Sequence, residues 1–347
     1  LISNKDISYN GSSVLGMGFF LSDAEANSLI HRNPRNVDVI FPVINGEDIT
    51  SNQEIKPSRW IICFFDWDEE TAKNYPECYN IVRDRVYTDR QKQNDKGAKE
   101  KWWLYLRPRM ELYEKLKDLQ RCIAVPLTSK HLSFSILPTN IVYTHAIGLF
   151  IYDKFFFFTL LQSCFHNEWV RKYASSLESR LRYTSSDVFE TFPFPQNQKH
   201  EIAQLLEQIG EEYHDFRKEL MLNLQLGLTK TYNLFHTKEL TVDNAHLKKA
   251  NLQIPIEDAL SEIYKLRRLH KQMDEAVLQA YGWTDIELKH DFYEVDYLPE
   301  NDRVRYTIHP DARKEILKRL LELNHKIHDE EVKAGLWDKK GKKTVKK

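Results

Sequence analysis

The sequence predicts an α+β fold in which a mixed N-terminal domain precedes a mainly helical C-terminal domain. Residues 1–195 alternate short β-branched and aromatic runs with turn-forming residues, which is typical of short strands and loops. Residues 196–347 repeat apolar side chains every three or four positions, which is typical of amphipathic helices. Pro193 and Pro195 interrupt both patterns and mark the expected domain boundary.

The composition fits a folded protein of about two domains. The chain has 347 residues, of which 41% are hydrophobic and 12% aromatic, so it can bury a sizeable core. The formal net charge of -1 excludes a chain that is basic throughout, but it allows one basic face. No apolar run reaches the roughly 18 residues of a membrane span, and the first residues do not resemble a signal peptide. We therefore expect a cytoplasmic protein.

The four cysteines are expected to be buried, reduced thiols. Cys63, Cys78, Cys122 and Cys164 each lie among apolar residues, and none belongs to a Cys-x-x-Cys pair. This spacing favours a packing role over a disulfide or a metal site.

The N-terminal domain should contain short strands and a few helices. A capping box formed by Ser22 and Glu25 predicts the start of a short helix, and Asn45-Gly46-Glu47-Asp48 is interpreted as a tight turn. The polar residues 91–100 should form a mobile loop. The expected strands are residues 37–44, 58–65, 123–125, 132–137, 141–143 and 149–151, and the expected helices are 69–81, 156–169 and 185–190.

Basic and aromatic side chains are concentrated between Arg83 and Arg121. Basic groups neutralise phosphates, and arginine can also form paired hydrogen bonds with a guanine edge. The alternative is an ordinary solvated basic surface with Trp102 and Trp103 in the core. The candidates for contact with DNA from this stretch are Lys101, Arg107 and Arg109.

Two further stretches supply candidates for base or phosphate contact. A predicted hairpin loop carries Ser129, Lys130 and His131, which can reach base edges, although a plain polar turn has the same composition. Residues 160–195 then change from apolar to basic and aromatic. This stretch adds His166, Arg171, Arg180 and Arg182, with a satisfied interface histidine as the alternative for residue 166.

The C-terminal domain should contain three long helices. The first begins near Ile202 and ends at Gly227, and a connector over residues 228–236 follows it. The second runs from Ile256 to about Gly282, and the third covers residues 311–332. A short strand is expected over residues 303–308, and the lysine-rich residues 339–347 should form a disordered basic tail.

A series of short motifs, collinear over most of the chain, resembles the target-recognition and C-terminal regions of MmeI-like adenine-specific DNA methyltransferases. These are type IIL and IIG restriction–modification enzymes and their relatives in phage defence. The motifs are Gly16-x-Gly18-Phe19, Asn45-Gly46-Glu47-Asp48, Arg59-Trp60-Ile61-Ile62, Trp102-Trp103, Leu161-Gln162-Ser163, Phe192-Pro193-Phe194-Pro195, Leu226-Gly227-Leu228-Thr229, Ala280-Tyr281-Gly282-Trp283 and Tyr306-Thr307-Ile308-His309-Pro310.

The resemblance implies that residues 1–195 form a target-recognition domain for double-stranded DNA. The catalytic partner would be a methyltransferase domain of the same polypeptide, which would use S-adenosylmethionine to methylate adenine N6. Such enzymes turn the target base out of the duplex, so a separate module must hold the remaining base pairs.

The chain by itself is expected to be non-catalytic and to bind no cofactor. Its segment Asn33-Pro34-Arg35-Asn36 has an arginine and an asparagine where the amino-methylating motif requires proline and an aromatic residue. One alternative is a metal-dependent nuclease that uses Asp285, Glu287 and Lys289, although this acid-x-lysine pattern is short and common. Another alternative is a protein-interaction scaffold formed by the helical part.

Overall fold

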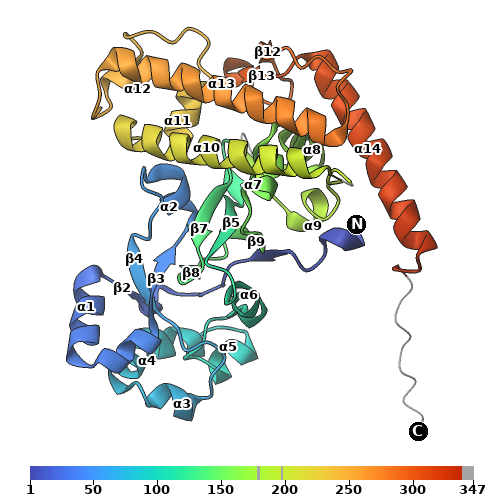
Figure 1. Ribbon diagram of the computed structural model, residues 1–347. Helices are drawn as coiled ribbons and strands as arrows, with labels where there is room; N and C mark the ends of the chain where they lie inside the picture. The colour runs from blue at the N-terminus through green and yellow to red at the C-terminus, as the bar shows by residue number, and fades with distance from the viewer. Residues whose placement is uncertain (178–179, 197, 338–347) are drawn as a thin grey trace.

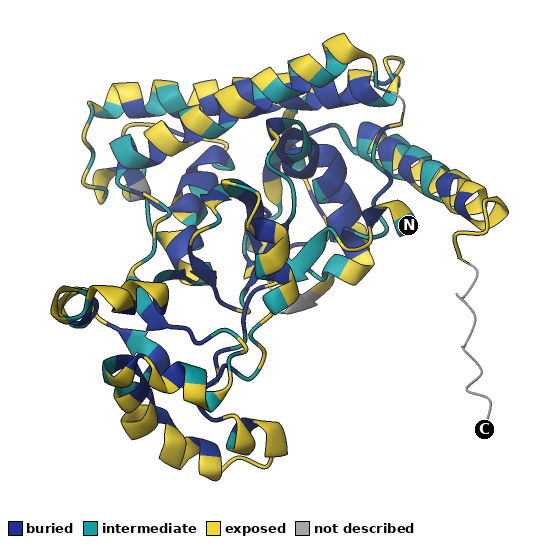
Figure 2. Ribbon diagram, turned by 60° about the horizontal axis from the view of Figure 1, so that its bottom comes forward, coloured by how far each residue is buried: buried dark blue, intermediate teal, exposed yellow. Residues whose placement is uncertain are grey.

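The computed structural model describes residues 1–177, 180–196 and 198–337 and has the predicted α+β fold. Three tiers are visible in Figure 1: a helical layer, a central antiparallel sheet and a lower lobe. Figure 2 shows that buried residues follow the central strands and the inward faces of the helices. The basic tail expected over residues 339–347 lies outside the described residues.

The central sheet has four antiparallel strands in the order β1-β9-β5-β7. The register places Tyr9 opposite Leu149 and Ile123 opposite Phe150. Helices on either side complete its core with residues such as Leu112, and this explains why the inner strands β5 and β9 are almost wholly buried. The elements of this tier are η1 (Ile2–Asn4), β1 (Ser8–Asn10), α6 (Met110–Leu116), β5 (Arg121–Pro126), β7 (Ser135–Pro138), β9 (Ile147–Phe150), α7 (Phe155–Gln162), α8 (Cys164–Tyr173) and α9 (Ser185–Val188).

The lower lobe is formed by residues 14–105, which are inserted between β1 and β5, together with β8 from later in the chain. Its sheet has the order β2-β4-β3-β8, with β3 parallel to β8 and the other pairs antiparallel. Trp102 and Trp103 are buried in the core of this lobe, as the alternative reading of the basic stretch expected. The elements are η2 (Met17–Phe19), β2 (Phe20–Leu21), α1 (Asp23–Arg32), η3 (Pro34–Asp38), β3 (Ile40–Ile44), β4 (Arg59–Ile62), α3 (Glu69–Lys73), α4 (Pro76–Gln91), α5 (Lys96–Glu100) and β8 (Val142–Tyr143).

A short helix, α2 (Gly46–Ser51), lies between the lower lobe and the helical layer. The expected tight turn at residues 45–48 is therefore wrong. The Asn45 side chain accepts hydrogen bonds from the backbone N–H groups of Glu47 and Asp48, and the Asp48 carboxylate accepts one from the Asn45 N–H at 2.8 Å. These contacts form a capping box, which starts a helix and does not reverse the chain.

Two expected helices are each divided into two in the structure, and one expected loop contains a helix. The helix expected over residues 69–81 is divided into α3 and α4 because Pro76 cannot donate a backbone hydrogen bond. The helix expected over 156–169 is divided at Ser163, whose side chain accepts from the His166 N–H and starts α8. The expected mobile loop at 91–100 contains α5, which Asp95 caps.

A third sheet joins the predicted hairpin loop to the segment after α8. It contains β6 (Thr128–Ser129), β11 (Arg180–Arg182) and β10 (Ser175–Leu177), in the order β10-β11-β6. Arg182 is paired with Thr128 and Leu181 with Ser129. The loop at residues 128–131 therefore begins as a strand, because β11 supplies partners for its backbone.

The helical layer is built on two long helices, α10 (His200–Leu224) and α13 (Ile256–Tyr281), which pack against each other. The predicted long helices are confirmed, and α13 ends at Gly282 with a left-handed φ of 70°. The expected connector at 228–236 is instead helix α11, and Gly227 is its N-cap. The other elements are α11 (Leu228–Phe235), α12 (Ala245–Lys248), β12 (Asp291–Glu294), η4 (Glu300–Asp302), β13 (Val304–Thr307) and α14 (Pro310–Lys333).

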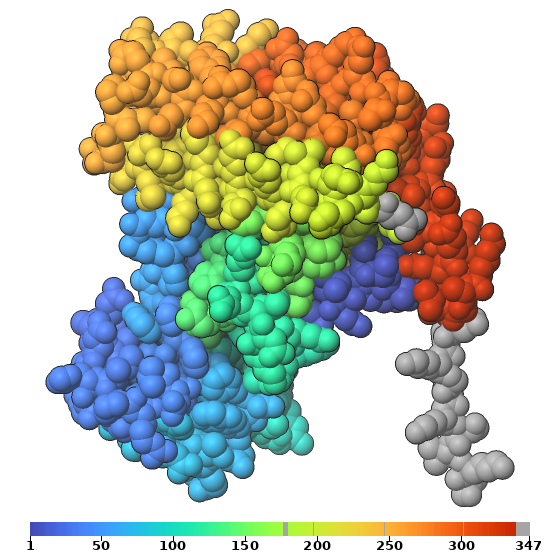
Figure 3. All heavy atoms as spheres, viewed as in Figure 1, coloured from blue at the N-terminus to red at the C-terminus, as the bar shows by residue number. Residues whose placement is uncertain are grey.

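The helical layer and the central sheet share one hydrophobic core. A single cluster contains Phe150 and Phe158 together with Tyr213, Leu220 and Ile263. Figure 3 shows the helical layer seated directly on the sheet tier, with no gap between them. The domain boundary at residue 195 stays a prediction, since packing is continuous across it. Among the helices that the structure describes, none combines the length and hydrophobicity needed to cross a bilayer.

Candidate nucleic-acid interface

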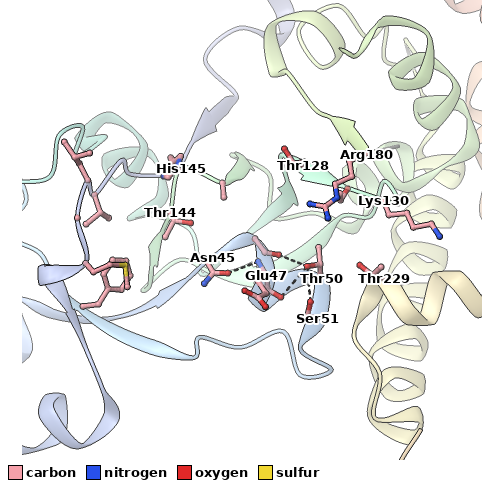
Figure 4. Close-up of a pocket in the computed structure, with 18 residues that line it drawn as sticks. Asn45, Glu47, Thr50, Ser51, Thr128, Lys130, Thr144, His145, Arg180 and Thr229 are labelled. Atoms are coloured by element: carbon pink, nitrogen blue, oxygen red, sulfur yellow. Dashed lines mark hydrogen bonds between the residues drawn. The ribbon is translucent and has the colours of Figure 1, made fainter. Parts of the chain in front are cut away.

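A cleft of about 1030 Å³ lies between the lower lobe and the third sheet. The segment 14–20 and helix α2 form one side, and β6 and β11 face them. Figure 4 shows the Arg180 guanidinium extending into this space, opposite Glu47, Thr50 and Ser51 of α2. Thr229 at the start of α11 closes one end.

A second hollow, of about 650 Å³, continues the cleft along the same face. The two hollows share Thr128, His145 and Ala146 in their linings. The second is also lined by Arg109, Arg182 and residues of β1. We call the two hollows together the basic groove.

Three arginines supply the positive charge of the basic groove. Arg109, Arg180 and Arg182 are exposed, and none has an acidic ion-pair partner among the residues that the structure describes. Arg180 and Arg182 flank buried Leu181 on β11, so both side chains project from the same face of the strand. Arg109 is held at a left-handed φ of 63° where α6 begins.

Lys130 lines the cleft, but its charge is partly neutralised. Its Nζ lies 3.2 Å from Asp302 Oδ2, and the same carboxylate oxygen lies 2.5 Å from Arg305. In the described lining of both hollows Glu47 is the only acid, so the groove carries a net positive charge. Such a surface attracts anions, and polyanions most strongly.

Two exposed apolar side chains stand at the mouth of the cleft. Met17 is 65% exposed and Leu15 is 39% exposed, and both line the first hollow. The backbone at their centre is constrained, because Leu15 has a φ of 53° and Gly16 a φ of 111°. Phe19, completely buried, anchors this tip, and Arg90 donates to the Val14 carbonyl at 2.9 Å. The tip is therefore an apolar projection on a fixed base.

The structure places five of the ten predicted site residues in the lining of the groove: Arg109, Ser129, Lys130, Arg180 and Arg182. Ser129 lies in the wall, and its hydroxyl donates to the His131 carbonyl at 2.8 Å, so it is not free to reach a ligand. Lys101 and Arg107 are exposed outside the groove. Arg107 forms a backbone bridge with Ser13, and contact with DNA stays a prediction for both.

His131 and His166 are core residues that do not line the groove, and contact with bases stays a prediction for both. His166 has no exposed surface, and its Nε2 lies 3.0 Å from the Tyr183 hydroxyl. His131 is buried behind β6, where its Nε2 lies 2.9 Å from Asn233 Oδ1. Burial lowers the pKa of each histidine to about 3, so both rings are neutral.

Arg171 is also not positioned for direct contact. Its guanidinium stacks over the Tyr297 ring at 5.0 Å and donates to the Lys130 carbonyl at 3.3 Å. Burial lowers the pKa of this guanidinium. Arg171 therefore supports the loop that carries Lys130.

The alternative nuclease site is not assembled. Arg319 binds Asp285 through two hydrogen bonds of 2.8 and 2.5 Å, and Glu287 is paired with Lys289 at 2.7 Å. These carboxylates are exposed and neutralised by cations of the chain itself. The scaffold alternative stays a prediction.

Sequence reasoning missed His145, the apolar tip and helix α2. The motifs at residues 16–19 and 45–48 mark the tip and α2 in the sequence, but they do not show that these elements meet in one cleft, since this depends on the tertiary fold. His145, for example, is positioned by a backbone hydrogen bond from its N–H to the Ser12 carbonyl at 2.9 Å. The unusual pair Leu15-Gly16 is a further local signal, since glycine often accompanies a left-handed turn.

Residues 3–196 match the family model described as "MmeI, target recognition domain". The match covers more than half of the chain, so the chain belongs to this family, and the resemblance predicted from the motifs is confirmed. No curated protein matches the chain.

The fold is similar to that of the type IIL restriction-modification enzyme MmeI, whose structure was solved in complex with DNA. The TM-score is 0.63 at 18% sequence identity, and the match covers 93% of this chain and 35% of that chain. This chain therefore spans about a third of the solved MmeI chain. The similarity extends beyond the target recognition domain and includes the helical layer.

Proposed function

We propose that this chain is the DNA-reading part of a site-specific DNA methyltransferase and that the basic groove holds double-stranded DNA. The observation that carries the proposal is the position of Arg109, Arg180 and Arg182, which line one groove without acidic partners among the described residues. Membership of the target recognition domain family supports the same function.

The spacing of the arginines on β11 fits a duplex. Side chains at positions i and i+2 of a strand lie roughly 6.7 Å apart. Two base-pair steps of DNA rise by about 6.8 Å. Arg180 and Arg182 can therefore contact positions two base pairs apart along the duplex, through phosphates or through base edges.

The groove also offers groups that distinguish bases. Ser51 and Thr128 present hydroxyl groups, and Asn45, whose Oδ1 caps α2, presents its amide NH2 group in the same cleft. Hydroxyl and amide groups form directional hydrogen bonds with base edges, whereas arginine–phosphate contacts mainly fix the register. The apolar tip at Met17 provides a surface for a thymine methyl group or a base face.

We further propose that the catalytic step belongs to a methyltransferase domain of the same polypeptide, in the cytoplasm. That domain would bind S-adenosylmethionine and methylate adenine N6 for restriction–modification or phage defence. The support is the family membership together with the length of the MmeI chain, of which this chain matches 35%. In this arrangement the present chain contributes binding and sequence selection, and it performs no chemical step itself.

The test is a fluorescence anisotropy titration of a labelled duplex with this chain at increasing salt concentrations. Contacts with four phosphates predict a fall in affinity of roughly 100-fold between 50 and 200 mM salt. Absence of binding at 50 mM salt would contradict the proposal, and so would an affinity that does not change with salt.

A further inference from the structure

A buried cluster of metal-ligating side chains lies outside the basic groove, where α8, α13 and β13 meet. Cys164 is the first residue of α8, and His270 and Asp274 are one turn apart on α13. Their exposures are 5%, 7% and 0%, respectively. One ligand atom from each residue lies within 4.8 Å of the other two, and no other such group was found among the described residues. Figure 1 shows α8 directly beneath α13.

The distances between these atoms match those around a tetrahedral zinc ion. Cys164 Sγ lies 3.4 Å from His270 Nε2, and His270 Nε2 lies 3.6 Å from Asp274 Oδ2. Zinc binds thiolate sulfur at about 2.3 Å and nitrogen or oxygen at about 2.0–2.2 Å, which sets neighbouring ligand atoms about 3.3–3.6 Å apart. The third pair, Cys164 Sγ and an Asp274 carboxylate oxygen, lies within 4.8 Å, so a small movement of the Asp274 side chain would bring all three donors onto one ion.

A second layer of hydrogen bonds orients the three donors. The Tyr213 hydroxyl lies 3.3 Å from His270 Nδ1, so the Nε2 of that ring faces the cluster. The Cys164 N–H donates to Asp274 Oδ1 at 2.8 Å, and His290 Nε2 lies 2.8 Å from Asp274 Oδ2. Residues that hold metal ligands in this way are a regular feature of zinc sites.

Two of the three donors, Cys164 and His270, border a small internal cavity. The cavity has a volume of about 60 Å³, and Cys164, His270 and Thr307 contribute to its lining. A cavity of this size can hold a water molecule. His236 also lines it, and the buried Nδ1 of that ring has no hydrogen-bond partner among the described residues. A water molecule in this cavity would give this nitrogen a hydrogen-bond partner.

We propose that Cys164, His270 and Asp274, with a water molecule, bind one Zn²⁺ that joins the recognition domain to the helical layer. Cys164 belongs to the segment matched by the family model, whereas His270 and Asp274 lie beyond it. The mixed sulfur, nitrogen and oxygen donors suit zinc, which is borderline soft and accepts all three. Binding forms a zinc–sulfur bond and releases the thiol proton to the solvent. This proposal does not depend on DNA binding.

The direct experiment measures metal content. The full chain is produced in zinc-supplemented medium, dialysed against metal-free buffer and analysed by mass spectrometry for zinc per chain. The expected result is about one zinc per chain. In addition, Co²⁺ added to the chain after zinc removal should give a thiolate-to-cobalt charge-transfer band in the near ultraviolet. A chain that retains less than about one-tenth of an equivalent of zinc and shows no cobalt band would overturn the proposal.

Two matched substitutions separate a zinc site from a metal-free network of hydrogen bonds. Cys164→Ser should lose at least about nine-tenths of the bound zinc and the cobalt band. Cys63→Ser, at a thiol with the same exposure of 5%, should keep both. Chelation of zinc should lower the Tm of wild type by on the order of 5 °C and leave the Tm of Cys164→Ser unchanged. Equal zinc content in the two variants would also overturn the proposal. If Cys164→Ser does not fold, the presence or absence of the cobalt band in the wild-type chain decides whether the zinc site exists.

Discussion

The apolar tip of the lower lobe shows how a single residue can be placed for binding and contribute little to folding. Met17 is largely exposed, yet it stands next to Phe19, which is completely buried against Tyr105. Gly18 allows this approach, because a Cβ at that position would lie 2.6 Å from Val86 Cγ2. The fold thus fixes the backbone of the tip and leaves the Met17 side chain free.

We therefore expect Met17→Ala to weaken duplex binding by about 3- to 10-fold, which corresponds to the loss of one or two buried methylene groups. The free energy of unfolding should change by less than about 0.5 kcal/mol, since the side chain is exposed. Anisotropy titration and urea denaturation measure the two quantities. Val332→Ala, at an exposed apolar residue of α14, is the control. Identical DNA affinity in Met17→Ala and wild type would contradict the placement of DNA against the tip.

The buried histidine at position 166 predicts a pH dependence of stability. Its pKa is about 3 in the folded chain because of burial, compared with about 6.5 in an unfolded chain. Below pH 6.5 the unfolded state binds a proton that the folded state does not, so the stabilisation is complete above pH 6.5 and is lost as the pH falls towards 3. One such histidine removes about 1.4 kcal/mol between pH 7.5 and 5.5.

The substitution His166→Gln should remove this contribution. The difference in unfolding free energy between pH 7.5 and 5.5 should then be smaller than in wild type by about 1.4 kcal/mol, whatever the stability of the variant at pH 7.5. Urea denaturation at both pH values measures it, with His325→Gln on the exposed face of α14 as the control. An unchanged difference in His166→Gln would show that this ring titrates in the folded chain.

At the scale of single elements, the sequence predicted what local chemistry decides. The capping box at Ser22 and the glycine that ends α13 are set by neighbouring residues, and both are confirmed. Helix α2 was missed because Asn-Gly is also a common turn sequence, and the choice depends on the Asp48 carboxylate. Strand β6 was missed because its partner, β11, lies about 50 residues further along the chain.

Helices α2 and α11 meet at Gly227, and this contact shapes one end of the groove. A Cβ at Gly227 would overlap the backbone of Ser51, so only glycine allows this approach. Gly227→Ala should therefore destabilise the chain by about 1–3 kcal/mol, because the two helices must separate. Gly46→Ala is the matched control, since its Cβ would have no contact closer than 3.6 Å. Urea denaturation should give a lower free energy of unfolding for Gly227→Ala than for Gly46→Ala, and equal stability of both would contradict the close contact.

At the scale of the whole molecule, neither the groove nor the buried cluster of Cys164, His270 and Asp274 could be located from the sequence. Each combines residues that are far apart in the chain, such as Asn45 with Arg180 and Cys164 with His270. The residue types were informative, since the charge of the arginines alone predicts three of the residues that line the groove. Burial was not predictable, because His166 and Arg180 are both polar. Only the packing of α7, α8 and β11 makes His166 a core residue and leaves Arg180 exposed.

One buried arginine connects the recognition domain to the helical layer. Arg217 of α10 is 2% exposed and donates to the Phe134 carbonyl at 2.6 Å, to Ser133 Oγ at 3.0 Å and to the Tyr232 hydroxyl at 3.1 Å. Arg217→Met should lower the free energy of unfolding by about 3 kcal/mol, because it leaves these acceptors without a donor. Lys218→Met, at the exposed neighbouring position, should change stability by less than about 0.5 kcal/mol. If urea denaturation gave the same loss of stability for Arg217→Met and Lys218→Met, the role of Arg217 in joining the two parts would be contradicted.

The salt dependence of duplex binding tests the central claim, that the basic groove holds DNA, most directly. The triple variant Arg109→Gln, Arg180→Gln, Arg182→Gln removes three charges from the groove that have no acidic partner among the described residues, while Arg268→Gln removes an exposed charge from α13. If each of the three neutralises one phosphate, the slope of log affinity against log salt should become shallower by about 2.7 in the triple variant. The slope should stay unchanged in Arg268→Gln. A triple variant that keeps the wild-type affinity and slope would contradict the account.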